Sequence, residues 1–273
     1  MYKGLKTFSL EELTIKIKEI SGKWHKGVAK GDQGAGRTLE KLLGIEENNI
    51  SLPDYGTIEI KSKIIKKNEP QGLISLFTKE PLPEASVPQL IKSMGWKHHN
   101  AGKKYPRTEQ VFSSTINLEL STNRGFFIDV TEDKIYIKFD SSKVVRNDPD
   151  RSRSKAYINL GEWLDDIERR KNPHYSEVMP LHYLRKDLED QFIKKLNNTF
   201  FCLCRSKKDG ETINYQYYEG YILKDLISEK IANMFKRGLF IDFGARTNHN
   251  HGTKLRMKKE NLFEMFKISE KIL

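Results

Sequence analysis

The sequence predicts an α/β protein, because segments with helical spacing and segments with strand-like alternation follow one another along the chain. Apolar residues spaced as on one face of a helix occur near residues 10–20 and 184–196. Alternating apolar and polar residues occur near 134–139 and 199–222, where they predict antiparallel strands. The 273 residues are enough for one large domain or two lobes with a proper core.

The composition favours a polyanionic partner. Lys and Arg number 48 against 37 Asp and Glu, so the formal net charge is +11. Nucleic acid is the first partner that such a charge indicates, although a ribosome-associated or membrane-surface protein shares it. No apolar run approaches a membrane span, and residues 1–4 lack the apolar core of a signal peptide. With only Cys202 and Cys204, we expect no disulfide scaffold and a cytoplasmic location.

The N-terminal part predicts two helices. Ser9 and Glu12 form a capping-box pattern that begins the first of them. The second follows a glycine-rich turn from Lys30 and ends at Gly44. Its N-terminus, with Lys30 and Arg37, is suited to a DNA phosphate, but a flexible connection explains the glycines more simply.

The segment from residue 53 to residue 61 carries the chemistry. Ile58 and Ile60 predict a short strand, on which Glu59 and Lys61 project from the same face. Asp54 precedes a glycine at which the chain can turn back. Two carboxylates, the backbone carbonyl of Ile60 and waters suit Mg²⁺, and Lys61 could orient a water for phosphodiester hydrolysis. The alternative is a solvated strand face, because 31% of all residues are charged.

Glu40 lies on the helix just before this strand. It could reach the same site as a third carboxylate, or it could simply pair with a neighbouring lysine.

The remaining segments predict further strands, helices and loops. We expect a buried strand at 72–79, a basic loop at 97–107, strands at 126–130 and 134–139, and a long mobile loop at 140–155. Strands at 199–205 and 212–222, a helix at 223–237, strands at 239–243 and 253–257 and a final helix at 260–272 follow. His98 and His99 lack spaced zinc partners, and Cys202 and Cys204 are expected to be buried core thiols.

The segment 244–252 joins the last two strands and is dense in side chains that hydrogen-bond to base edges. Arg246 can bind guanine in the major groove, and His249 and His251 can donate to guanine acceptors. The two histidines are also spaced like metal ligands, but no nearby acid or cysteine completes such a site. We therefore favour base contact over zinc.

Four blocks of the sequence resemble the MvaI/BcnI-type restriction endonucleases, relatives of the mismatch-repair nickase MutH. They are Trp24-His25 through the 36–43 helix, 53–61 (Pro-Asp-Tyr to Glu-Ile-Lys), 75–81 (Ser-Leu-Phe-Thr-Lys-Glu-Pro) and 243–256 (Phe-Gly-Ala to Lys-Leu-Arg). The blocks occur in the family's order and spacing, whereas residues 96–198 carry little recognisable match.

The resemblance implies a PD-(D/E)XK restriction-endonuclease-like core with a mixed central sheet and a DNA-recognition lobe. Asp54, Glu59 and Lys61 match the catalytic triad, and Glu40 matches the extra helix-borne acid of the MutH-like branch. The metal would be Mg²⁺, held by Asp54, Glu59 and the carbonyl of Ile60. The resemblance further implies a two-lobed monomer that grips DNA in a cleft, with a catalytic lobe at 1–95 and a recognition lobe at 96–273, some of whose elements may pack back on the core.

The family's base-reading positions fall in the last block. His249, His251 and Arg256 match positions that read guanines, and Lys254 lies between them as a further DNA contact. The family's other base-reading arginine falls on Asp242 here, and Arg246 is the candidate substitute. The resemblance implies cleavage of a short C/G-rich, CCNGG-like site and a partner methyltransferase that acts on the same site.

Three other functions stay open at this point. A MutH-like repair nickase would share the catalytic residues. A non-catalytic DNA-binding protein would leave the convergence of Glu40, Asp54, Glu59 and Lys61 unexplained. An RNA-binding protein is supported only by the net charge and the tyrosines.

Overall fold

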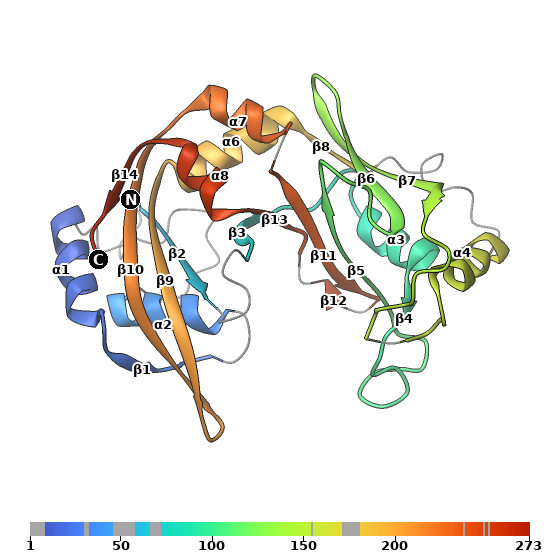
Figure 1. The fold of residues 1–273 in the computed structure, drawn as a ribbon, viewed down its shortest axis with the longest axis horizontal. Helices are drawn as coiled ribbons and strands as arrows, with labels where there is room; N and C mark the ends of the chain where they lie inside the picture. Colours follow the sequence, from blue (N-terminus) through green and yellow to red (C-terminus); the bar gives the residue numbers. More distant parts are fainter. Residues whose placement is uncertain are drawn as a thin grey trace. The chain divides into compact units, whose positions relative to one another are not determined.

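The chain folds into two compact units, each built from several segments (Figure 1). The computed structural model describes residues 9–29, 33–45, 58–65, 72–153, 155–170, 181–236, 238–247, 249–250 and 252–273. The first unit comprises Met1–Ile74, Glu189–Ile231 and Lys258–Leu273, and the second comprises Ser75–Leu188 and Ala232–Met257. No helix among the described residues is long and apolar enough to cross a membrane.

The boundaries of these units differ from the expected division of the chain into lobes at 1–95 and 96–273. Residues 75–95 belong to the second unit, whereas 189–231 and 258–273 belong to the first. The reason is that strands from the C-terminal half, β9, β10 and β14, complete the sheet that contains β1 and β2. The assignment of catalysis to one unit and of recognition to the other stays a prediction.

The first unit is organised around a mixed sheet with the strand order β1-β10-β9-β2, and β14 also pairs with β10. The pairing of β2 with β9 is parallel, and the pairings of β10 with β1, β9 and β14 are antiparallel. The strands are β1 (Trp24–Lys26), β2 (Glu59–Ile64), β9 (Asn198–Asp209), β10 (Thr212–Leu226) and β14 (Phe266–Lys271). The mixed α/β fold is therefore confirmed.

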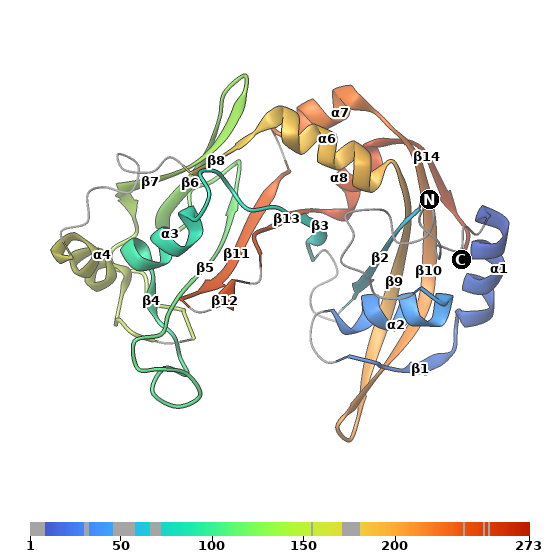
Figure 2. The ribbon, with the colours of Figure 1, turned by 180° about the vertical axis from the view of Figure 1, so that it is seen from behind.

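Two helices, α1 (Leu10–Ile20) and α2 (Gly34–Leu43), pack on one face of this sheet. In Figure 2, α2 crosses β9 and β10. The predicted capping box is present, with Glu12 N–H donating to Ser9 Oγ and Ser9 N–H donating to the Glu12 carboxylate. A Cβ at Gly34 would lie 2.2 Å from the Tyr215 hydroxyl oxygen, so packing against β10 requires glycine there. This contact gives a structural reason for part of the glycine-rich segment.

The expected helix at 223–237 is wrong over its first part. Strand β10 continues to Leu226, and helix α7 spans only Ser228–Met234. Lys224 pairs with both Asn198 and Ile268, and Asp225 has a positive φ of 58°, which a right-handed helix excludes.

The expected helix at 260–272 is wrong over its second part. Helix α8 spans Lys259–Glu264, and the following residues form β14 on the edge of β10. Phe266 and Phe263 had suggested one apolar helical face, but the sheet edge provides backbone partners that a local pattern does not register.

The second unit contains two sheets. One has the order β3-β13-β11-β5-β4 with β12 beside β11, and the other has the order β6-β7-β8. The strands are β3 (Ile74–Thr78), β4 (Trp96–Lys97), β5 (Gln110–Asn117), β6 (Arg124–Val130), β7 (Lys134–Val144), β8 (Leu181–Leu184), β11 (Phe240–Arg246), β12 (His249–Asn250) and β13 (Lys254–Met257). Helix α3 (Ser86–Met94) packs on β5 and β11, and α4 (Leu160–Arg169) packs on β7. Helix α6 (Arg185–Leu196) leads from the second unit into the first.

The segment 140–155 is not the long mobile loop that its composition suggested. Strand β7 continues to Val144, and Asp150 is only 7% exposed. The Asp150 carboxylate accepts a hydrogen bond from the Arg124 guanidinium at 2.7 Å, and that guanidinium lies over the rings of Trp96 and Trp163. A buried ion pair between two indole rings therefore ties this segment to the core.

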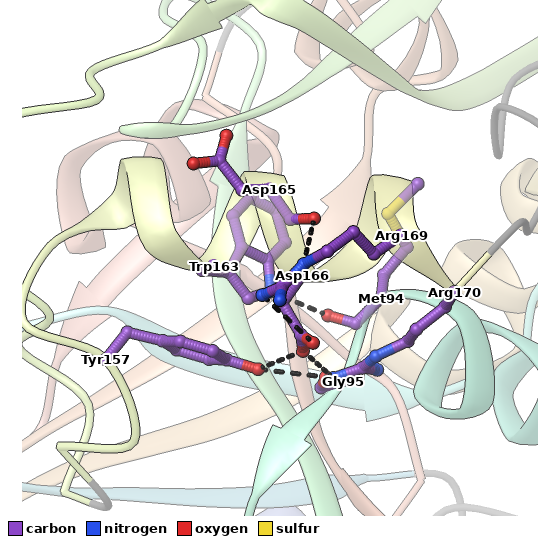
Figure 3. A network of polar contacts seen from close by, with 8 residues as sticks. All are labelled: Met94, Gly95, Tyr157, Trp163, Asp165, Asp166, Arg169 and Arg170. Carbon is purple, nitrogen blue, oxygen red and sulfur yellow. Dashed lines mark hydrogen bonds and ion pairs between the residues drawn. The ribbon is translucent and has the colours of Figure 1, made fainter.

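A second polar network holds α4 against the end of α3 (Figure 3). Asp166 accepts hydrogen bonds from the Tyr157 hydroxyl at 2.7 Å and from Arg170 at 2.5 Å, and Arg170 also donates to the Gly95 carbonyl. Burial, followed by the hydrogen bond to Asp166, raises the pKa of Tyr157 to about 12. A hollow of about 550 Å³ beside it is lined by Tyr157, Arg169 and three acids, so it is poorly suited to a polyanion.

The two cysteines are buried core thiols on β9, as expected. Both are 0% exposed, and burial raises the pKa of Cys204 to about 12 and that of Cys202 further.

We predict that both thiols of the native protein react with a thiol-specific reagent at pH 8 at less than about a tenth of the rate measured in 8 M urea, because neither a thiolate nor access is available. Rapid reaction of either thiol in the native protein would contradict this packing.

Candidate functional site

Two of the candidate catalytic residues, Glu59 and Lys61, lie on β2, a strand of the first unit whose two faces carry different side chains. Ile60 points into the core formed with α1 and α2, so alternation puts Glu59 and Lys61 on the opposite face. Lys61 Nζ donates to Glu59 Oε1 at 2.5 Å. The two side chains are 17% and 5% exposed, so this ion pair is largely withdrawn from water.

The pairing of β2 with β9 explains why Glu59 is buried. Glu59 lies opposite Thr199 and Lys61 lies opposite Phe201, which are 1% and 0% exposed. A carboxylate in such surroundings is costly unless cations or hydrogen-bond donors compensate it. The predicted convergence of an acid and an ammonium on one strand face is therefore present, and it is built into the interior of the fold.

The structure adds Lys195, which the sequence analysis did not identify. Its Nζ lies 3.9 Å from Glu59 Oε2, and its side chain is 16% exposed. Lys195 lies three residues after Phe192 and immediately before Leu196, and both of these are fully buried. A lysine on the apolar side of a helix was the available signal, but only the pairing of β9 with β2 shows which acid it meets.

Other predicted residues of this site are placed less completely. Asp54 and Lys30 lie outside the described residues. Arg37 is exposed on α2, and Glu40 lies on the same helix. The pKa of Tyr217 is raised mainly by burial, and the charges of three neighbouring groups and of Glu40 add smaller effects. The participation of Glu40 in a metal site stays a prediction.

Among the described residues, no group of three or more His, Cys, Asp or Glu side chains is arranged to hold a metal. Glu59 nevertheless supplies a buried carboxylate oxygen beside the backbone of Ile60, and both are oxygen donors of the kind that Mg²⁺ prefers. The residues present therefore fit a divalent cation, with Asp54 as the predicted second carboxylate.

In the second unit, β11 carries Arg246 and β13 carries Arg256, two of the predicted base-reading residues. Arg256 donates to Asp242 Oδ2 at 2.9 Å, and the Thr115 hydroxyl donates to Asp242 Oδ1 at 2.8 Å. The acid at the position where the resemblance implies an arginine thus fixes the direction of Arg256. Lys254 shares the less buried face of β13 with Arg256, whereas Leu255 between them is fully buried.

The Glu80 side chain holds Thr253, the residue that precedes β13. The Glu80 carboxylate accepts hydrogen bonds from the Thr253 N–H at 2.7 Å and from the Thr253 hydroxyl at 3.2 Å. Gly252 has φ of +80°, and a Cβ there would lie 3.3 Å from the Thr78 Cβ, so glycine is required. These contacts set the register that decides which side chains of β13 face outward.

Arg246 occupies a different environment from Arg256. Its guanidinium donates to Glu109 Oε1 at 2.9 Å and lies over the Tyr105 ring at 4.2 Å from the centroid. The Glu109 side chain is 0% exposed. The role of Arg246 in base reading stays a prediction. His249 is exposed on β12, and His251 lies outside the described residues.

The paired histidines of the basic loop belong to the same neighbourhood. The rings of His98 and His99 stack with centroids 4.2 Å apart, and His98 Nδ1 accepts the Asn100 N–H at 3.0 Å. Burial, followed by the charges of His99 and Arg246, lowers the pKa of His98. The charged form of His98 is therefore disfavoured relative to that of a free imidazole.

We predict that Arg246→Ala and Arg256→Ala destabilise the protein to different extents. Loss of Arg246 removes an ion-pair partner from a fully buried carboxylate and should cost about 3 kcal/mol. Loss of Arg256 should cost about 1 kcal/mol or less, because Asp242 is 23% exposed and keeps its bond from Thr115. Urea denaturation measures both, and Glu109→Gln in the Arg246→Ala background should recover part of the loss. Equal losses for the two variants would contradict this distinction.

A family model and two solved structures match the chain over most of its length. The family model of the MvaI/BcnI restriction endonucleases matches residues 14–266, and no curated protein sequence matches the chain. A solved complex of the restriction endonuclease MvaI with its cognate DNA substrate has a TM-score of 0.70 at 21% identity, covering 98% of this chain and 100% of that chain. A solved structure of MvaI in the absence of DNA has a TM-score of 0.48 at 22% identity over the same shares. The likeness to the complex supports the fold, and the match over nearly the whole sequence confirms the resemblance: the chain belongs to the MvaI/BcnI restriction endonuclease family.

Proposed function

We propose that this protein is a type II site-specific deoxyribonuclease that cuts a short, C/G-rich, CCNGG-like duplex site by Mg²⁺-dependent phosphodiester hydrolysis. The observation that carries the proposal is the buried Glu59 carboxylate held by Lys61 on β2, in a chain of a restriction endonuclease family. A solvated strand face would not bury its acid to 3% exposure. A non-catalytic DNA-binding protein gives no reason for that burial.

Residues of β2, together with Asp54 and Glu40, would divide the chemistry between them. Asp54, Glu59 and the carbonyl of Ile60 would hold Mg²⁺, with Glu40 as a further acid. Bound Mg²⁺ supplies Lewis acidity and stabilises the charge that develops on the phosphate oxygens. Lys61 would orient the water whose oxygen attacks phosphorus. As the phosphorus–oxygen bond on the opposite side breaks, the attacking water loses a proton to solvent and the leaving oxygen takes one up from solvent.

Recognition would come from the outward face of β11–β13. Arg256, His249 and His251 would bind guanines, with Arg246 and Lys254 as neighbouring contacts and Lys30 and Arg37 at phosphates. The MvaI complex contains its cognate DNA substrate, which supports duplex DNA as the partner of this chain. A monomer with one active site would make a double-strand break by two sequential nicks or by two molecules.

The cellular setting belongs to the same proposal. A methyltransferase of the same specificity would protect the host DNA without forming a stable complex. The two free thiols support a cytoplasmic location, where thiols stay reduced.

The first test is incubation of purified protein with a sequence-diverse, unmethylated plasmid, with Mg²⁺ or with EDTA. We expect discrete fragments with Mg²⁺ only, and a loss of roughly 100-fold or more in rate for Asp54→Ala, Glu59→Gln and Lys61→Ala. Glu19→Gln, which changes an exposed acid on α1, is the matched control and should cut normally. Nicked circles alone would favour a MutH-like repair nickase, and DNA binding without scission would favour a binding protein.

A second test separates sequence-specific recognition from non-specific binding to DNA. Arg256→Ala should lose about 1–3 kcal/mol of discrimination at one base pair, whereas Arg37→Ala should weaken binding to all sequences equally. Competition binding between the cognate duplex and single-base variants, at fixed salt, measures both. An unchanged preference in Arg256→Ala would remove Arg256 from the recognition surface.

A further inference from the structure

Lys195 places a second ammonium at the buried carboxylate of the candidate active site. Lys61 Nζ lies 2.5 Å from Oε1 of Glu59, and Lys195 Nζ lies 3.9 Å from Oε2. The two cations therefore approach the two oxygens of one carboxyl group. All three side chains are at most 17% exposed.

The position of Lys195 follows from the turn that joins α6 to β9. Thr199 Oγ1 donates to the Leu196 carbonyl at 3.1 Å across this turn, and Thr199 is the residue that pairs with Glu59. Phe192 and Leu196, on either side of Lys195 along the apolar face of α6, are 0% exposed. The helix packing thus fixes the base of a side chain that would otherwise extend into solvent.

The burial of Lys195 calls for a reason, because lysine is among the residues least often found inside proteins. Its neighbour Lys194 is exposed on the same helix, so α6 does not bury its lysines in general. A strand face with one buried acid and one ammonium would already be paired through Lys61. The second ammonium adds orientation of the carboxylate and positive charge to the same site.

We infer that Lys195 is a positioning residue for the proposed hydrolysis, which holds the Oε2 side of the Glu59 carboxylate while Lys61 engages Oε1. This inference rests on the proposed function. Without Lys195 the carboxylate gains rotational freedom, so the geometry that the reaction requires is populated less often. Its ammonium also repels any divalent cation at Glu59, because like charges this close in a poorly hydrated site interact strongly.

Loss of Lys195 should therefore slow cleavage but strengthen the binding of a divalent cation, and measuring both quantities tests the inference. The variants are Lys195→Ala, Lys195→Arg and the matched control Lys194→Ala. The measurements are the single-turnover cleavage rate with Mg²⁺, the binding of Mn²⁺ alone to DNA-free protein, and the melting temperature. Mn²⁺ binding that survives Glu59→Gln is subtracted as binding at other sites.

For Lys195→Ala we expect cleavage to slow by roughly 10- to 100-fold, while Mn²⁺ binds at least about threefold more tightly. Lys195→Arg keeps the charge and should restore both values toward wild type. Lys194→Ala should match wild type in all three measurements. A role confined to helix packing would instead lower the melting temperature and leave the Mn²⁺ affinity unchanged or weaker.

The inference is overturned if Lys195→Ala cuts at the wild-type rate, or if slower cleavage comes with unchanged or weaker Mn²⁺ binding. If the wild-type protein cuts no DNA, the proposed function fails separately. In that case tighter Mn²⁺ binding by Lys195→Ala still supports the placement of its charge at Glu59, and unchanged binding overturns it.

Discussion

The parallel pairing of β2 with β9 is the constraint on which the candidate active site depends. Glu59 lies opposite Thr199, so the strand that shields this carboxylate comes from a distant part of the sequence. Parallel neighbours need a crossover connection, and here that crossover contains most of the second unit. The chain between the two strands therefore has to return through α6, and its last turn brings Lys195 to the acid.

The same principle, a carboxylate that directs a cation, recurs in the second unit. Asp242 orients Arg256, and buried Glu109 holds Arg246 against the Tyr105 ring. In each pair the acid sits on or beside β11, and the arginine loses conformational freedom before any ligand arrives. Such preorganisation would lower the entropy cost of the proposed base reading. Arg256 would leave its acid more readily than Arg246, because Asp242 is 23% exposed and Glu109 is 0% exposed.

Local patterns in the sequence predicted the elements whose residues interact with near neighbours. The capping box of α1, the β6–β7 hairpin and the pairing of Glu59 with Lys61 all depend on spacings of a few residues. The failures lie where a distant partner decides, as at residues 223–226 and 266–271, which join a sheet instead of continuing helices. Lys195 was missed for the same reason. A lysine in a helical pattern gives no sign that β9, the next strand, pairs with the strand that carries Glu59. Asp54 was predicted from a motif, and its placement in space is not described.

If one chain both selects a DNA sequence and hydrolyses it, the ends of its cleavage products reveal both properties at once. A duplex library with a randomised segment would be incubated with the protein and Mg²⁺, and the new ends would be sequenced. We expect every new end to lie at a fixed position within one short C/G-rich sequence. New ends spread over unrelated sequences, or none from a folded, DNA-binding protein, would contradict this expectation.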